Sequence, residues 1–205
     1  MDLTLIIIII TTLASIAAFE SPRIFDRLLL SPYMIVHRNE WYRVITHGFI
    51  HANWMHLLIN MFVFYSFGQA LMAYFTYYVG NAMIHFLVIY FGGMIFATLT
   101  TIMKNRNNYA YRGIGASGAV SAVLFACIFF DPWRKLLFMG IIPVPGIIFA
   151  ILYLVYCSYM SRNSNDNINH DAHLYGAIFG FIYPVLIKPD LFQFFITDLM
   201  NPFGQ

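Results

Sequence analysis

Charged side chains are scarce in this 205-residue chain: only 10% of the residues are Asp, Glu, Lys or Arg, whereas 60% are hydrophobic and 19% are aromatic. Soluble domains carry about 25% charged residues, so this composition excludes an ordinary soluble domain and indicates a membrane protein. The formal net charge of +2 is too small to indicate a nucleic-acid ligand. We therefore expect the lipid bilayer as the surroundings and no nucleic acid as a partner.

Cysteine is also rare. Both cysteines, Cys127 and Cys157, lie inside apolar runs, where a thiol is usually a small core residue. His47, His51 and His56 are close in the sequence and could suggest a metal site. However, His51 and His56 are separated by about 140° around a helix, and no carboxylate or thiolate accompanies them. We expect neither a metal nor a cofactor.

Charge is absent altogether from six apolar runs, which comprise residues 3–19, 54–75, 82–103, 117–130, 141–160 and 172–187. A bilayer is crossed by about 20 apolar residues, and a single segment crosses as a helix because lipid offers the backbone no hydrogen-bond partners. No positive residues precede the first run, as they would in a signal peptide, so we expect it to be a retained helix. The sequence predicts an all-α membrane protein, a six-helix bundle forming one domain over residues 1–205.

The segment between the first two runs, residues 20–53, mixes charged residues with Trp, Tyr and Leu, which suits an amphipathic segment in the membrane interface. The loops that follow runs one, three and five hold eight Lys and Arg residues, against three on the opposite side. The positive-inside rule would place the first set of loops in the cytoplasm.

Polar residues within apolar runs are energetically expensive and therefore mark candidate functional groups. The second, fourth and sixth runs enter the membrane from the same side, because one returning helix separates each from the next. Ser117 begins the fourth run and His173 is the second residue of the sixth. His56 and Asn60 lie early in the second run and share one helix face at a spacing of i, i+4. The topology predicts that these four side chains lie at a similar depth.

Small residues favour close packing of the fourth and sixth runs. Gly118 follows Ser117, while Gly176 and Gly180 follow His173 in a Gly-x-x-x-Gly stripe of the kind that lets membrane helices approach closely. Such packing would bring the Ser117 hydroxyl within hydrogen-bond reach of the His173 imidazole. A hydroxyl beside an imidazole is the minimum for nucleophilic acyl transfer, because the imidazole takes the hydroxyl proton and later returns it to the leaving amine.

The oxyanion formed in such a reaction also needs hydrogen-bond donors. Candidates are the backbone N–H of Ser117, which has no partner within its helix, and the side chains of His56 and Asn60. Asp171 lies only two residues before His173, so its side chain points away from the histidine on a helix and a third triad member is not expected. Taken alone, the glycines around Ser117 favour a helix-packing turn rather than catalysis.

Together these residues resemble the rhomboid family of intramembrane serine proteases, over nearly the whole chain. The resemblance rests on four matches: Gly115-Ala116-Ser117-Gly118, Ala172-His173 followed by Gly176 and Gly180, His51 with His56 and Asn60, and Arg43 late in the first loop. It implies that Ser117 is the nucleophile and His173 the general base, in a dyad without an acid member. It also implies an oxyanion hole made by His56, Asn60 and the Ser117 amide. The supporting residues it implies are Gly115, Gly118, Gly176, Gly180, His51 and Arg43.

The resemblance further implies transmembrane protein segments as substrates, cleaved where they enter the membrane. It implies a half-embedded first loop, a cap formed by residues 161–171, and movement of the fifth helix or this cap to admit substrate. Bacterial members are inner-membrane proteins with the site opening to the extracytoplasmic side. That orientation conflicts with the loop charge count, and we follow the resemblance.

Two departures from the family pattern raise structural questions. The chain has Tyr42-Arg43 where the family often has Trp-Arg, which leaves open how the arginine is anchored. Ser121 lies one turn after Ser117, where some members carry a tyrosine that stacks on the catalytic histidine, so another residue must hold His173.

The sequence is less compatible with two other functions. An inactive relative that binds membrane clients would usually lack Ser117 or His173, and both are present. A channel or transporter would be expected to place charges in mid-membrane, which the six runs lack.

Overall fold

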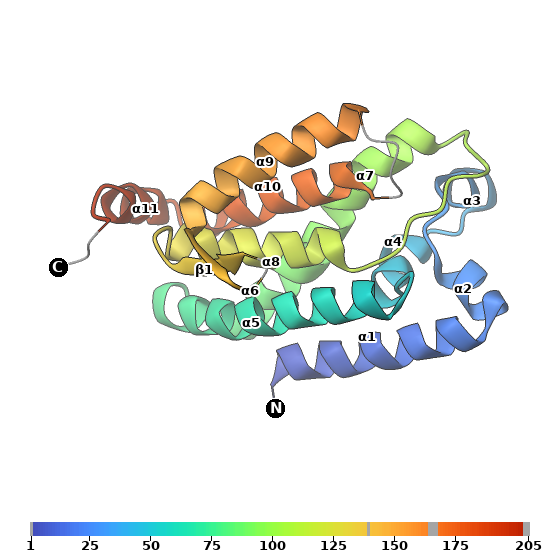
Figure 1. Cartoon of the computed structure of the whole chain (residues 1–205), viewed down its shortest axis with the longest axis horizontal. Helices are drawn as coiled ribbons and strands as arrows, with labels where there is room; N and C mark the ends of the chain where they lie inside the picture. The colour runs from blue at the N-terminus through green and yellow to red at the C-terminus, as the bar shows by residue number, and fades with distance from the viewer. Residues whose placement is uncertain (1, 139, 164–167, 203–205) are drawn as a thin grey trace.

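The computed structural model describes residues 2–138, 140–163 and 168–202, which are mostly helical (Figure 1). The elements are α1 (Leu3–Glu20), α2 (Pro22–Leu28), α3 (Pro32–Arg38), α4 (Arg43–Thr46), η1 (His47–Phe49), α5 (Trp54–Tyr78), α6 (Ala82–Leu87), η2 (Val88–Gly92), α7 (Gly93–Asn105), α8 (Ser117–Phe130), β1 (Lys135–Phe138), β2 (Ile142–Pro145), α9 (Gly146–Asn163), α10 (His170–Ile187) and α11 (Leu191–Leu199). The long helices run roughly side by side, and α11 lies at one end of the bundle.

Three helical stretches in the described part of the chain are long and apolar enough to cross a membrane. They are α1, α5 and the continuous stretch Ala82–Asn105, in which η2 is a single π-helical turn. By contrast, α8 has only 14 residues, so it is about 21 Å long against a hydrocarbon core of about 30 Å. It is nevertheless the central helix, since every residue after Ser117 is buried among α5, α7, α9 and α10 (Figure 1).

The fifth apolar run departs most from the predicted helix boundaries. Its first residues form strand β2, which pairs with the preceding strand β1 in a small antiparallel hairpin with Lys135 opposite Pro145. The helix predicted from residue 141 therefore begins only at Gly146. Pro143 and Pro145 lack the N–H that a helix interior requires but are tolerated in an edge strand. This hairpin is a small exception in an otherwise helical chain.

Glycines create a very close contact between α8 and α10. A Cβ atom at Gly176 would overlap the carbonyl oxygen of Gly118, and one at Gly180 would overlap that of Ala122. A Cβ at Gly118 would lie 3.3 Å from the carbonyl oxygen of Ala172. Because lipid provides little hydrophobic drive for helix association, such backbone contacts supply much of the packing energy. The contact begins at the first turn of both helices.

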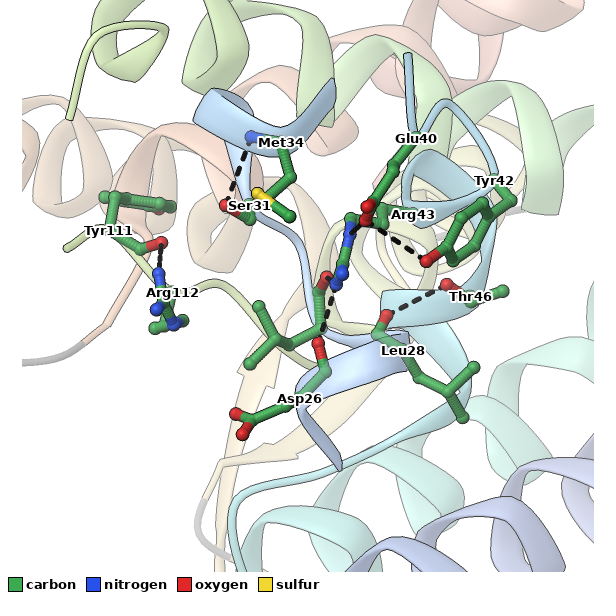
Figure 2. Close-up of polar contacts among 11 residues, drawn as sticks. Asp26, Leu28, Ser31, Met34, Glu40, Tyr42, Arg43, Thr46, Tyr111 and Arg112 are labelled. Atoms are coloured by element: carbon green, nitrogen blue, oxygen red, sulfur yellow. Dashed lines mark hydrogen bonds and ion pairs between the residues drawn. The ribbon is translucent and has the colours of Figure 1, made fainter. Parts of the chain in front are cut away.

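The segment between α1 and α5 folds into short helices around Arg43 (Figure 2). Arg43 itself is buried, with an exposed fraction of only 6%. Its Nε donates to the Glu40 carboxylate at 2.6 Å, and Nη1 donates to the carbonyl oxygens of Asp26 and Leu29, each at 2.8 Å. A buried guanidinium is tolerated only with such partners. Glu40 and two backbone carbonyl groups therefore anchor the arginine. They do so although Tyr42 stands where the family that the sequence resembles often has tryptophan.

Candidate active site

The predicted site residues lie at one end of the bundle. Ser117, His173 and His56 occupy the first turns of α8, α10 and α5, and these three helices all begin at this end (Figure 1). Ser117, His173 and His56 are partly exposed, whereas Asn60, one turn further along α5, is buried. Ser117 directly precedes Gly118 and His173 directly follows Ala172, so both flank the close contact between α8 and α10.

The backbone before Ser117 follows a path that requires glycine. Gly115 has φ +104°, and a Cβ there would lie 2.7 Å from Cε1 and 2.9 Å from Nε2 of the His56 imidazole. Its N–H donates to the carbonyl oxygen of His47 at 2.9 Å. The next N–H, that of Ala116, donates to Nε2 of His51 at 3.5 Å. Gly115 therefore brings the chain against His56 just before the serine.

Hydrogen bonds determine the protonation of His51. Because Nε2 accepts from Ala116, the neutral ring carries its proton on Nδ1 and donates it to the Ser15 hydroxyl at 3.0 Å, which donates in turn to the Phe49 carbonyl oxygen. His51 is fully buried, and desolvation lowers its pKa to about 3. This neutral histidine joins α1 to the loop before Ser117, which is a structural role.

His56 and Asn60 present donors near the same loop. The His56 Nδ1 accepts a hydrogen bond from the Ala52 N–H at 3.5 Å, so the neutral ring carries its proton on Nε2, the atom beside Gly115. The Asn60 Nδ2 donates one of its two protons to the His56 carbonyl oxygen at 2.9 Å. Its second proton remains a potential donor.

Two further backbone contacts tie the first loop to the residues preceding Ser117. Leu30 and Gly113 exchange hydrogen bonds of 2.8 and 3.0 Å, and Leu29, next to Leu30, accepts from Arg43. Arg43 thus supports the loop before the serine through the first-loop backbone, without contacting the serine.

A small cavity of about 20 Å³ adjoins Ser117. Its lining includes the polar residues Ser117, His47, Thr98 and Asn169. This volume is sufficient for one water molecule, and polar walls are what a bound water requires. The Nδ1 of His47 donates to the Arg43 carbonyl oxygen at 2.9 Å, and burial lowers the pKa of His47 to about 4.

The aromatic surroundings of His173 come from α9 and from its own helix. The Tyr153 ring lies parallel to the imidazole, with an interplanar angle of 11° and centroids 6.3 Å apart. His170 approaches edge-on, with centroids 6.2 Å apart. Asp171 forms an ion pair with Lys104, at 2.7 Å between Oδ2 and Nζ. Among the residues described, no group of three or more His, Cys, Asp or Glu side chains could hold a metal ion.

Residues 38–189 match the sequence profile of the Rhomboid domain family. The chain belongs to the rhomboid family. Because it belongs to this family and has several helices long and apolar enough to cross a bilayer, this rhomboid is an integral, multi-pass membrane protein.

This rhomboid is similar to proteins from bacteria and plants. It is 32% identical over 151 residues to YdcA of Bacillus subtilis (strain 168), named a candidate rhomboid protease, with 74% of this chain and 69% of the relative covered. Identity is 26% over 204 residues with the mitochondrial rhomboid-like protein 12 of Arabidopsis thaliana, covering 89% of this chain. Identity is 29% over 174 residues with the chloroplastic rhomboid-like protein 11 of Arabidopsis thaliana, covering 79% of this chain. The chain spans 58% of the length of each Arabidopsis relative.

Sequence reasoning missed Tyr153 in this rhomboid. The indirect signal was Ser121, because a serine at that position leaves the imidazole without an aromatic neighbour from α8. Nothing in the spacing of Tyr153 relative to His173 reveals their contact, since they lie on different helices separated by a loop.

Acidification should destabilise this rhomboid through His47 and His51. The unfolded chain binds a proton at each histidine near pH 6.5, whereas the folded chain resists protonation down to about pH 4 and pH 3. Stability from these neutral histidines is therefore complete above pH 6.5 and is lost as the pH falls. The loss should reach about 2–3 kcal/mol per histidine at pH 4.5.

Unfolding midpoints measured in detergent at pH 7.5 and pH 4.5 check this expectation. The variant His51→Gln lacks one titrating group and should lose less stability than the wild-type protein between these pH values. Equal losses in the two proteins would contradict the assignment to His51.

Proposed function

We propose that this rhomboid is an intramembrane serine endopeptidase in which Ser117 is the nucleophile and His173 the general base. The observation that carries the proposal is the close contact between α8 and α10, where glycines replace side chains beside both residues. Family membership supports it. The proposal keeps the expected architecture of six membrane spans in one domain with a half-embedded first loop.

In the proposed reaction, the Ser117 hydroxyl attacks the scissile carbonyl while the His173 imidazole takes its proton. The oxyanion accepts hydrogen bonds from the Nε2–H of His56, the second N–H of Asn60 and the backbone N–H of Ser117. The N-cap residue of α8 is Ala116, whose side chain offers no acceptor to the N–H groups of the first turn. His173 then protonates the leaving amine, and water hydrolyses the acyl-enzyme.

The proposed substrates are transmembrane segments of other membrane proteins, and no cofactor is needed. Because α8 is shorter than the bilayer is thick, Ser117 would lie below the membrane surface if the opposite end of α8 reaches the other surface. A helical substrate hides its carbonyl groups in its own hydrogen bonds, so segments with small or helix-breaking residues near their ends should be preferred.

The remaining parts of the proposal concern location and access. The enzyme would lie in a bacterial inner membrane with its site open to the extracytoplasmic side. The expected cap, residues 161–171, includes residues 164–167, which lie outside the described residues. Within the described part, Asn169 is tied to α7 by a hydrogen bond from its Nδ2 to the Thr101 hydroxyl at 2.9 Å.

Labelling with a fluorophosphonate probe in detergent tests the proposal. The wild-type protein should be labelled and Ser117→Ala should not, because the probe forms a covalent bond only with an activated serine. Ser66→Ala is a matched control, since the Ser66 hydroxyl donates to its own helix at Phe62 and lies on an exposed face of α5. Equal labelling of the wild-type protein and Ser117→Ala would overturn the proposal. A complete lack of labelling would favour an inactive client-binding rhomboid.

A further inference from the structure

Tyr153 connects the candidate dyad to α9 through two contacts. Its ring stacks on the His173 imidazole, with an interplanar angle of 11° and a centroid separation of 6.3 Å. Its hydroxyl hydrogen-bonds with the Ser121 hydroxyl at 2.9 Å. Ser121 lies on α8 one turn after Ser117 and is buried. One tyrosine from α9 therefore touches both helices that carry the dyad.

A stacked ring can restrain the His173 imidazole, because the χ2 angle of histidine has a broad, soft energy minimum. In a Ser-His-Asp triad a carboxylate orients the imidazole, but the nearest acidic residue in sequence, Asp171, is paired with Lys104. Parallel, offset aromatic rings at 4.5–7 Å attract one another. The stack on Tyr153 can therefore hold the imidazole plane in place of a carboxylate.

The Tyr153 ring is itself fixed on two sides. Phe149, one turn earlier on α9, stacks on it with centroids 5.5 Å apart and an interplanar angle of 26°. Ser121 hydrogen-bonds with the Tyr153 hydroxyl, while Phe149 packs against the face of the ring. Ser121 is therefore part of a support that joins α8 to α9.

We infer that Tyr153, held by Ser121, is the positioning residue for the general base His173. This inference rests on the proposed function. Because Tyr153 belongs to α9, the orientation of the imidazole depends on α9 remaining packed against α8 and α10. Displacement of α9 would remove the stacking partner of His173 and break the hydrogen bond to Ser121 together.

Kinetic measurements on three α9 variants test the inference. Tyr153→Leu should lower both kcat and the fluorophosphonate labelling rate by about 10²-fold, a typical cost of misplacing a catalytic group, with little change in KM. Tyr153→Phe keeps the stacking ring and should recover most of the loss. Tyr159→Leu is the matched control, since it removes a tyrosine ring from an exposed position on the same helix, and it should remain near the wild-type rate.

A spectroscopic measurement separates positioning from stability and from the proposed function. In histidine-labelled protein, the ring protons of His173, assigned by their loss in His173→Gln, should be shifted by the Tyr153 ring current. The shift should disappear in Tyr153→Leu and persist in Tyr153→Phe, while the unfolding midpoints should show that all variants are folded.

Each result decides the inference. Loss of the ring-current shift together with lost labelling in Tyr153→Leu supports it. A folded Tyr153→Leu variant with wild-type labelling and kcat would overturn it, and so would a His173 resonance that does not change. Wild-type protein that shows the ring-current shift but no labelling at Ser117 would remove the proposed function, and with it the catalytic consequence inferred for Tyr153.

Discussion

Replacing Ser117 with alanine should lower the turnover of a transmembrane substrate by about 10⁴–10⁶-fold, and His173→Ala should lower it by a similar factor. The reason is that neither residue can act alone. The serine hydroxyl is a weak nucleophile without a base, and the imidazole has no proton to transfer without the hydroxyl. Cleavage of a reconstituted substrate in liposomes, followed by gel electrophoresis, measures both losses.

The double variant gives the sharper result. Because the two residues share one step, Ser117→Ala combined with His173→Ala should be no slower than either single variant. If the two losses instead multiplied, the residues would contribute independently and the dyad would be wrong. Asp171→Asn serves as the control, since its ion pair with Lys104 lies outside the proposed chemistry. It should retain most of the activity.

Substituting Gly180 with leucine should be among the most destabilising changes in the molecule. Even the Cβ of the new residue would overlap the carbonyl oxygen of Ala122 on α8, and backbone atoms cannot move aside as a flexible side chain can. Overpacking of this kind costs about 1–3 kcal/mol and more where backbone must shift. Separation of α8 from α10 should also reduce activity, because Ser117 and His173 lie at the far end of the same contact.

Unfolding midpoints in detergent and substrate cleavage measure the two consequences for Gly180. Gly180→Ala should show a smaller effect of the same sign, since its Cβ alone meets the carbonyl group. Val155→Ile is the control, because it adds one methyl group on the exposed face of α9. A midpoint for Gly180→Ala equal to that of the wild-type protein would show that α8 and α10 can separate without cost.

Much of the fold could be predicted from the sequence. The apolar runs predicted the positions of the long helices, and α8 begins and ends at the predicted residues because charged or glycine-rich segments adjoin both ends. The order of the apolar runs predicted that α5, α8 and α10 begin on the same side of the membrane, because one returning helix separates each from the next. The hairpin before α9 was missed because an apolar run of this length does not distinguish strand from helix. Pro143, which disfavours a helix interior, was a local signal against a helix there.

What the sequence by itself determined was the membrane setting, the order of the helices and the residue types available at one end of the bundle. These follow from local properties, namely hydrophobicity, helical periodicity and the direction in which each helix crosses. The tertiary structure alone decided which groups separated in the sequence meet: Arg43 with the Leu29 carbonyl, His51 with the Ala116 amide, and Tyr153 with His173. Those contacts depend on the rotation and depth of each helix, which are set by packing against neighbours, and no single segment of the sequence encodes them.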